Sequence, residues 1–256
     1  MNLPPASRLA PRRLIFLSSR VPEELELLTS EHDGIWLGWS GRVRPSPVRP
    51  VVDRDQRPFR AYFDMAADSR ERFGSTFCHR TLWPLLHGLR NRVHYTDGDW
   101  DAYARANDTY ARHAIQLATL DAAIWVHDYD LMLAGQALRR LGHRGPIGHV
   151  LNTPFPAREL FETLPWSRDL IEAMLAFDLL GFRSELWADN FRAAASRLLR
   201  VRSEPGMIWR DGHATRIGVF PQADGSWALT YLSTLQDLAR RSHTSEEATF
   251  RRVPGL

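Results

Sequence analysis

The stretch from Ala123 to Phe161 constrains the fold of this chain more than any other part of the sequence. Apolar residues 124–126 predict a buried strand, and residues 147–151 predict a second one. A helical pattern over residues 131–141 connects them, so the stretch predicts a βαβ unit. Each strand ends in polar residues, and ligands of open parallel sheets bind beyond the carboxyl ends of the strands. We therefore expect the functional site at that edge of the sheet.

Strand and helix patterns alternate along much of the remaining chain. Further strands are predicted over residues 14–17, 34–41 and 178–182, further helices over residues 100–120, 167–175 and 185–199, and a hairpin over residues 207–220. Residues 44–60, rich in Pro and Arg, predict a loop with an edge strand. The alternation predicts a single Rossmann-like, doubly wound α/β domain with a mainly parallel sheet over residues 14–221. Residues 222–256 are expected to be a divergent tail that is poorly ordered or forms a short helix.

Composition and charge narrow the class of protein. With 44% hydrophobic residues in 256, the chain can bury a core, and no apolar run is long enough to span a membrane. All 33 basic residues are Arg, scattered rather than striped, and the net charge is only +3, which argues against a nucleic-acid partner. The single cysteine, Cys78, cannot pair internally, so we expect a cytoplasmic protein in which a buried thiol is favoured over a reactive one.

A few side chains stand out as candidates for binding. Arg20 and Asp128 each close a predicted strand and suit a phosphorylated, hydroxylated ligand, although a structural ion pair explains them equally well. Trp83 is either a platform on which a sugar stacks or a core residue. His127 and Asp130 flank Asp128, but neighbouring strand residues point to opposite faces, so we expect no metal site. The common nucleotide, zinc and hydrolase motifs do not occur.

Several motifs, in order and spacing, resemble those of the UDP-forming trehalose-6-phosphate synthases, a family of retaining glycosyltransferases with the GT-B fold. The resemblance covers roughly residues 14–221. The motifs are Ser19-Arg20, GIWLGWSG (34–41), TLWPLLH (81–87), Trp100-x-x-Tyr103-x-x-x-Asn107, WVHDY (125–129), TPFP (153–156) with ELF (159–161), and DLLGF (178–182).

The resemblance implies a function and a set of binding residues. The chain would be the N-terminal, acceptor-binding half of a GT-B enzyme that transfers glucose from UDP-glucose to glucose 6-phosphate in trehalose biosynthesis. The position of Arg20 would contact the acceptor phosphate, and those of Trp83 and Asp128 its glucose. The family uses neither a metal nor another cofactor nor a catalytic nucleophile, so orientation and electrostatics would supply the rate.

Three positions depart from the family pattern. Residues 21–33 contain no glycine where the family has a glycine-rich, donor-contacting loop. Asn152 stands where the family has a His that contacts the donor sugar, and the family's acceptor-contacting Tyr falls at Gly74. An amide can hydrogen-bond a hydroxyl but carries no charge.

The family's second Rossmann domain, which holds most of the donor, is not found in these 256 residues. The resemblance therefore implies that this polypeptide alone is truncated and inactive. The alternative is a non-catalytic homologue that binds a sugar phosphate or a partner, either a separate donor-domain subunit or a second copy of itself. A pseudo-glycosyltransferase or a glucosyl-glycerol-phosphate synthase, which share the scaffold, also stays open.

Overall fold

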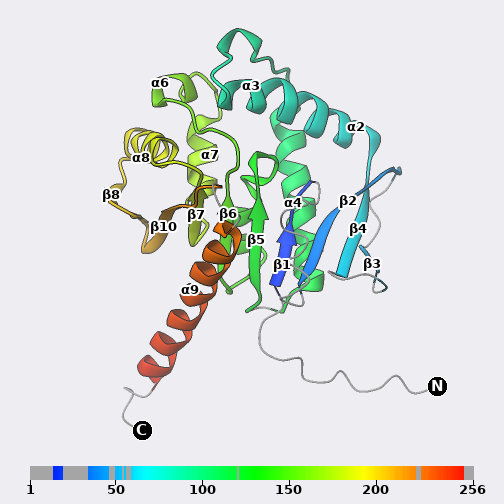
Figure 1. The fold of residues 1–256 in the computed structure, drawn as a ribbon. Helices are drawn as coiled ribbons and strands as arrows, with labels where there is room; N and C mark the ends of the chain where they lie inside the picture. Colours follow the sequence, from blue (N-terminus) through cyan, green and yellow to red (C-terminus); the bar gives the residue numbers. More distant parts are fainter. Residues whose placement is uncertain are drawn as a thin grey trace, which may run out of the picture.

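One ten-stranded sheet forms the centre of the protein, as seen in a computed structural model (Figure 1). The structure describes residues 14–19, 34–45, 50–53, 55, 59–119, 121–222 and 226–250. The strand order is β3-β4-β2-β1-β5-β6-β7-β10-β9-β8. The strands are β1 (Leu14–Leu17), β2 (Ile35–Val43), β3 (Val51–Asp53), β4 (Phe59–Met65), β5 (Ala123–His127), β6 (Ile147–Val150), β7 (Leu179–Phe182), β8 (Arg202–Glu204), β9 (Met207–Arg210) and β10 (His213–Val219).

Neighbouring strands from β4 to β10 in this order run parallel, and the edge strands β3, β9 and β8 pair antiparallel. The central strands β1, β5, β6 and β7 are buried along their whole length. Continuous apolar runs are typical of parallel strands because helices cover both faces of such a sheet. The predicted mainly parallel α/β domain is confirmed, including the βαβ unit β5-α5-β6.

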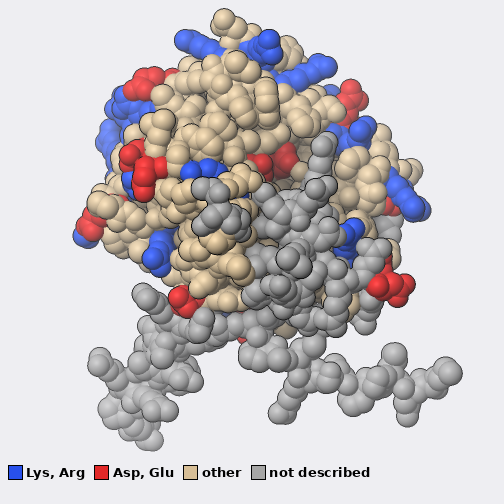
Figure 2. Space-filling view, viewed as in Figure 1, with Lys and Arg blue, Asp and Glu red and all other residues tan. Residues whose placement is uncertain are grey.

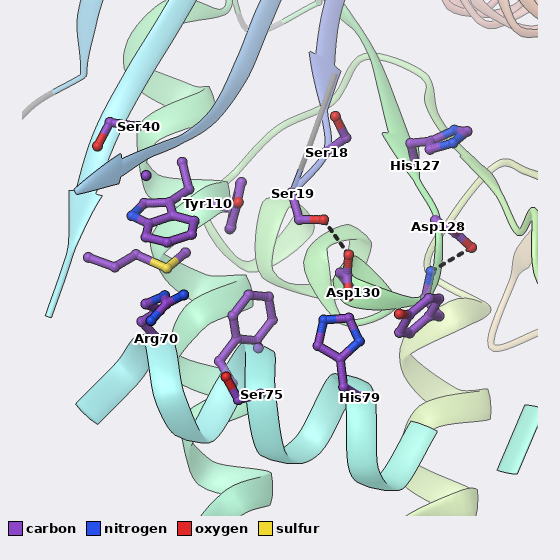
Figure 3. A pocket seen from close by; sticks show the side chains of 16 residues that line it. Ser18, Ser19, Ser40, Arg70, Ser75, His79, Tyr110, His127, Asp128 and Asp130 are labelled. Atoms are coloured by element: carbon purple, nitrogen blue, oxygen red, sulfur yellow. Dashed lines mark hydrogen bonds between the residues drawn. The ribbon is translucent and has the colours of Figure 1, made fainter. Parts of the chain in front are cut away.

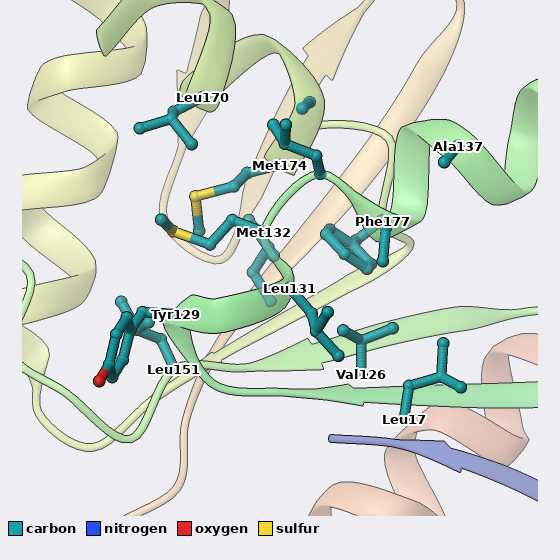
Figure 4. Close-up of a cluster of buried hydrophobic side chains, with 14 of the residues drawn as sticks. Leu17, Val126, Tyr129, Leu131, Met132, Ala137, Leu151, Leu170, Met174 and Phe177 are labelled. Atoms are coloured by element: carbon teal, nitrogen blue, oxygen red, sulfur yellow. The ribbon is translucent and has the colours of Figure 1, made fainter. Parts of the chain in front are cut away.

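Most of the helices pack on one face of the sheet, where the larger hydrophobic core lies. They are α4 (Asp99–Leu117), α5 (Ala134–Arg140), α6 (Arg158–Phe161), α7 (Ser167–Met174) and α8 (Glu185–Leu199), with short 3-10 turns η2 (Arg90–Arg92) and η3 (Tyr129–Leu131). Figure 4 shows part of this core, which includes Met132, Phe177, and Leu170 and Met174 of α7. This packing holds the carboxyl end of β5, which leads into η3.

A helical run that the sequence patterns did not predict follows β4. It consists of α2 (Ala67–Arg70), the π-helical segment η1 (Glu71–Leu82) and α3 (Trp83–Leu86), which continue one another without a break. Phe73, Phe77 and Leu82 on this run are buried in the core. The run lies across the carboxyl end of the sheet (Figure 1). Long π-helical segments are rare, and π-type turns are frequent at functional sites.

The tail expected over residues 222–256 differs from the expectation. It contains the 24-residue helix α9 (Trp227–Phe250), which begins against the opposite face of the sheet from α4 and then extends away from the body (Figure 1). Trp227, Tyr231 and Leu235 are buried there. An added Cβ at Gly148 of β6 would lie 2.2 Å from the Tyr231 hydroxyl, so the helix rests directly on the sheet.

Within the described residues, no helix is both long and apolar enough to cross a membrane. On the face seen in Figure 2, arginines and acidic side chains are interspersed, and the described residues form no broad basic stripe. This distribution is that of ordinary solvated charge.

Candidate functional site

A cavity of about 630 Å³ lies at the carboxyl edge of the sheet, between the strand ends and the α2–η1 helix (Figure 3). Pockets of about 300–1,000 Å³ are typical of small-molecule sites. The strand side contributes hydroxyls, carboxylates and an imidazole, and the helix side contributes a guanidinium and a second imidazole. The lining residues are Ser18, Ser19, Trp39, Ser40, Gly41, Met65, Arg70, Phe73, Gly74, Ser75, His79, Tyr110, His127, Asp128, Tyr129 and Asp130.

Asp128 lies on the strand side of the cavity and has a strained backbone, with φ 63° and ψ 178°. Positive φ is costly for a residue with a side chain and persists where the surroundings over-determine it, commonly at functional sites. Here one carboxylate oxygen, Oδ1, accepts from the backbone amides of Tyr129 at 3.0 Å and Asn152 at 3.2 Å, and from the Thr153 hydroxyl at 3.3 Å. These donors fix the carboxylate at the end of β5. No described residue donates a hydrogen bond to its other oxygen, Oδ2.

The electrostatics of the strand side depend on two neighbouring carboxylates. Burial raises the pKa of Asp128 to about 6, and the charge of Asp130 adds to the shift, against the lowering effect of the three donors. Asp130 accepts a hydrogen bond from the Ser19 hydroxyl (Figure 3). A carboxylate accepts hydrogen bonds only, so the pair offers acceptors for ligand hydroxyls.

His127 is held neutral behind the carboxylates. Burial lowers its pKa to about 3, and the positive charge of Arg183 adds to the effect. Its Nε2 lies 3.0 Å from the Asn152 amide nitrogen, and Asn152 Oδ1 accepts from Arg183 Nε. Arg183 also donates to the Phe220 carbonyl at 3.0 Å, and its guanidinium lies 3.4 Å from the centroid of the Trp227 ring. This chain of contacts ties the strand ends to the start of α9.

Among the described lining residues, the positive charge lies on the helix side of the cavity. The guanidinium of Arg70 lies 5.3 Å from the centroid of the Trp39 ring, within the range of a cation–π contact. Ser75 and His79 follow on the same helical run (Figure 3). The two sides of the cavity therefore differ in sign: carboxylates lie at the strand ends and a guanidinium lies on the helix.

The structure places the predicted site residues as follows. Asp128 lines the cavity, and Asn152 lies beside it without lining it. Trp83 is 38% exposed, so it is not a core residue, and it stacks on His87 at 4.1 Å outside the residues that line the cavity. Arg20 lies outside the described residues, so its predicted contact stays a prediction.

Two further expectations concern Cys78 and a metal. The thiol of Cys78 is buried, as the sequence favours, and burial together with Asp130 raises its pKa, which keeps it protonated. Among the residues that the structure describes, no group of three or more His, Cys, Asp or Glu side chains could hold a metal ion.

Sequence reasoning missed Arg70 and His79 as cavity residues, and it considered Asp130 only as a metal ligand. The argument that neighbouring strand residues point to opposite faces does not apply to Asp130, because the strand ends at His127 and the chain turns at Asp128 into η3. Arg70 and His79 carry no local signal of a site, because they reach the cavity only through the placement of the α2–η1 helix. Carboxylates facing a guanidinium across a cavity suit a ligand with hydroxyls at one end and an anionic group at the other.

Comparison with known proteins gives a consistent result. The family model described as glycosyltransferase family 20 matches residues 17–223. A bifunctional trehalose-6-phosphate synthase/phosphatase of Thermoproteus tenax is 34% identical over 189 residues, which are 73% of this chain and 26% of that protein. A trehalose-6-phosphate synthase of Mycobacterium avium is 33% identical over 232 residues, covering 85% of this chain and 46% of that protein. The chain thus spans between a quarter and a half of these relatives' length.

Solved structures agree in fold over the same part. A UDP-forming synthase of Burkholderia xenovorans superposes with a TM-score of 0.78 and 31% identity, covering 82% of this chain and 48% of that one. A structure of the xenovorans synthase in complex with glucose-6-phosphate gives a TM-score of 0.73 at 31% identity, with 82% and 49% covered. An Escherichia coli structure bound with UDP-2-fluoro glucose gives 0.76 at 29% identity, with 82% and 48% covered.

Proposed function

This chain belongs to glycosyltransferase family 20, and we propose that its cavity is the acceptor site of a trehalose-6-phosphate synthase-like glycosyltransferase that takes glucose 6-phosphate. In the complete reaction, glucose would pass from UDP-glucose to a hydroxyl of this acceptor. The chain covers 48% of the solved Burkholderia xenovorans synthase. The donor, UDP-glucose, and the transfer of glucose from it are therefore proposals as well.

One observation carries the proposal: the fixed carboxylate of Asp128 lines a cavity that Arg70 lines from the helix side. The strained turn and the three donors hold one oxygen of that carboxylate, and no described residue donates to the second, which would accept from a sugar hydroxyl. Hydrogen bonds between a charged group and a ligand hydroxyl contribute about 1.5–3 kcal/mol each. In catalysis, such bonds would orient the acceptor so that its hydroxyl meets the donor sugar.

Two further predicted contacts remain part of the proposal. Trp83 lies one helical turn beyond His79, and its exposed ring is available for a sugar, so we keep it as an acceptor contact. We also keep Arg20 as a contact of the acceptor phosphate, by resemblance alone. We propose no metal and no other cofactor for the site.

A second candidate function is a non-catalytic homologue that binds a sugar phosphate. One observation favours it: the amide of Asn152, at the position predicted to face the donor sugar, contacts both His127 and Arg183. An amide held on both sides has less freedom to turn toward a donor. Under this alternative, acceptor binding persists without transfer.

Isothermal titration calorimetry with glucose 6-phosphate tests the acceptor site. We expect saturable binding by the 256-residue chain, and a loss of at least tenfold in affinity for Asp128→Ala because the carboxylate is removed. Asp101→Ala, on the exposed side of α4, is the matched control and should bind as the unaltered chain does. Absence of binding by the unaltered chain would refute the acceptor assignment.

A turnover assay tests whether this polypeptide can transfer glucose, and only a positive result excludes the non-catalytic candidate. With UDP-glucose and glucose 6-phosphate, we expect no UDP release from this polypeptide alone, because it spans about half the length of the solved synthases. Stoichiometric release of UDP with a disaccharide phosphate would contradict that expectation and would exclude the non-catalytic alternative.

A further inference from the structure

We propose that Arg70 binds the phosphate of the acceptor, and that the acceptor therefore lies across the cavity with its hydroxyls at Asp128 and its phosphate against the α2–η1 helix. The inference rests on the proposed acceptor function and extends it to a residue and an orientation. Arg70 lines the cavity, and no other arginine does so among the described residues.

The helix geometry opens a path to Arg70. Arg70 ends α2, and Gly74 lies four residues on in the continuous helical run, so the two positions share one face. Both line the cavity. A Cβ built at Gly74 would have no atom within 4 Å, apart from its own helix and chain neighbours. The helix therefore has no side chain at the place where a ligand would reach the guanidinium.

The guanidinium is held in position for a ligand. It lies over the Trp39 ring at 5.3 Å, which restricts a long side chain and leaves its N–H edge available. Arg70 forms no ion pair with any described residue. Arg72, two residues on, donates instead to the Asp97 carbonyl at 3.1 Å and lies 3.8 Å from Asp99. A planar guanidinium without a carboxylate partner can bind a phosphate through two parallel hydrogen bonds.

The charged side chains that line the cavity favour one orientation of the acceptor. Figure 3 shows Arg70 on one side of the cavity and Asp128 and Asp130 on the other, with Ser75 and His79 along the helix between them. A phosphate carries about −1.5 to −2 charges near pH 7, so the carboxylates repel it and the guanidinium attracts it. Sugar hydroxyls donate to carboxylates. Among the described residues, the orientation with the phosphate at Arg70 pairs both ends of the ligand with complementary groups, whereas the reverse orientation places the phosphate beside Asp128 and Asp130.

The alternative is that Arg70 is an exposed, solvated arginine with no role in binding. That interpretation explains its exposure but predicts no effect of the side chain on a ligand in the cavity. The two interpretations therefore differ in one measurable quantity, the contribution of Arg70 to the affinity for a phosphorylated ligand compared with an unphosphorylated one.

Calorimetric titrations of the unaltered chain, Arg70→Ala, Arg70→Lys and Arg72→Ala test the proposal, with glucose 6-phosphate, glucose and inorganic phosphate as probes. We expect Arg70→Ala to weaken glucose 6-phosphate binding at least tenfold and to leave any glucose binding unchanged. Arg70→Lys should weaken it less, because it keeps the charge and loses the planar fork. Arg72→Ala should stay within twofold. Thermal melts verify that each variant is folded.

The outcomes distinguish this proposal from the acceptor assignment. Equal affinities of Arg70→Ala and the unaltered chain for glucose 6-phosphate overturn the role of Arg70 and leave the acceptor site standing. Binding of inorganic phosphate that depends on Arg70, without binding of glucose 6-phosphate, supports the phosphate contact and overturns the acceptor site. Absence of binding by all three probes overturns both.

Discussion

Replacement of Asp128 by Asn should make the protein more stable at neutral pH. Asn has nearly the same shape and keeps an oxygen that can accept from the Tyr129 and Asn152 amides and the Thr153 hydroxyl. It has no charge that must be buried. The substitution therefore removes the ionisation of this carboxyl with little change in its packing.

The magnitude follows from the pKa. Burial and Asp130 raise the pKa of Asp128 from 3.8 to about 6 in the folded state. Between these values the folded state holds a proton that the unfolded state has released, so the free energy of unfolding falls as the pH rises. A shift of about two units corresponds to about 3 kcal/mol. That stabilisation is fully present below pH 3.8 and is lost once the pH has passed about 6.

Urea denaturation followed by circular dichroism at several pH values between about 4 and 7.5 measures the effect. The difference in unfolding free energy between Asp128→Asn and the unaltered chain should move by about 3 kcal/mol in favour of the variant over this range. Ser75→Ala, which changes a cavity residue without an ionisable group, is the control and should give a constant difference. A difference for Asp128→Asn that does not vary with pH would refute the reasoning. The variant should also bind glucose 6-phosphate more weakly, as expected where function costs stability.

Three further predictions concern packing. Gly148→Ala should lower the free energy of unfolding, measured by urea denaturation, by more than 1 kcal/mol, because the added methyl would lie 2.2 Å from the Tyr231 hydroxyl. Adding Tyr231→Phe to that variant should recover part of the loss. An unchanged stability of Gly148→Ala would contradict the packing of α9 on the sheet. Trp227→Ala should lower the free energy of unfolding by about 3–5 kcal/mol, measured in the same way, because the Trp227 side chain is buried. A loss below 1 kcal/mol would contradict that burial. Gly74→Ala should raise the free energy of unfolding by about 0.5–1 kcal/mol, because Ala has a higher helix propensity than Gly and its methyl group would meet no atom within 4 Å. A melting temperature below that of the unaltered chain would contradict this prediction.

The placement of the cavity followed from sequence because the strands are read from local patterns. The buried runs at β1, β5, β6 and β7 are continuous because both faces of a parallel sheet are covered, and polar residues after such runs must meet at one edge. Asp128 was identified on this basis, and it lines the cavity. The family resemblance rests in part on the same strand ends, at Ser19-Arg20, WVHDY (125–129) and TPFP (153–156).

The α2–η1–α3 helix could not be predicted from local sequence patterns, because its composition disfavours a helix. Gly74, Ser75 and Thr76 are poor helix formers, and Pro84 lies near its end. The run is stabilised by the burial of Phe73 and Phe77 against distant parts of the chain. Its position, and with it the contribution of Arg70 and His79 to the cavity, depends on those long-range contacts.

Local sequence patterns predicted the strands, the edge of the sheet at which the cavity lies and the Asp128 carboxylate that lines it, because each depends on residues close together in the chain. The tertiary structure was needed to show that the α2–η1 helix borders the cavity, that Arg70 lines it with the carboxylates, and that α9 packs on the opposite face of the sheet. Those features depend on contacts between residues far apart in the chain, for which local propensity carries no information.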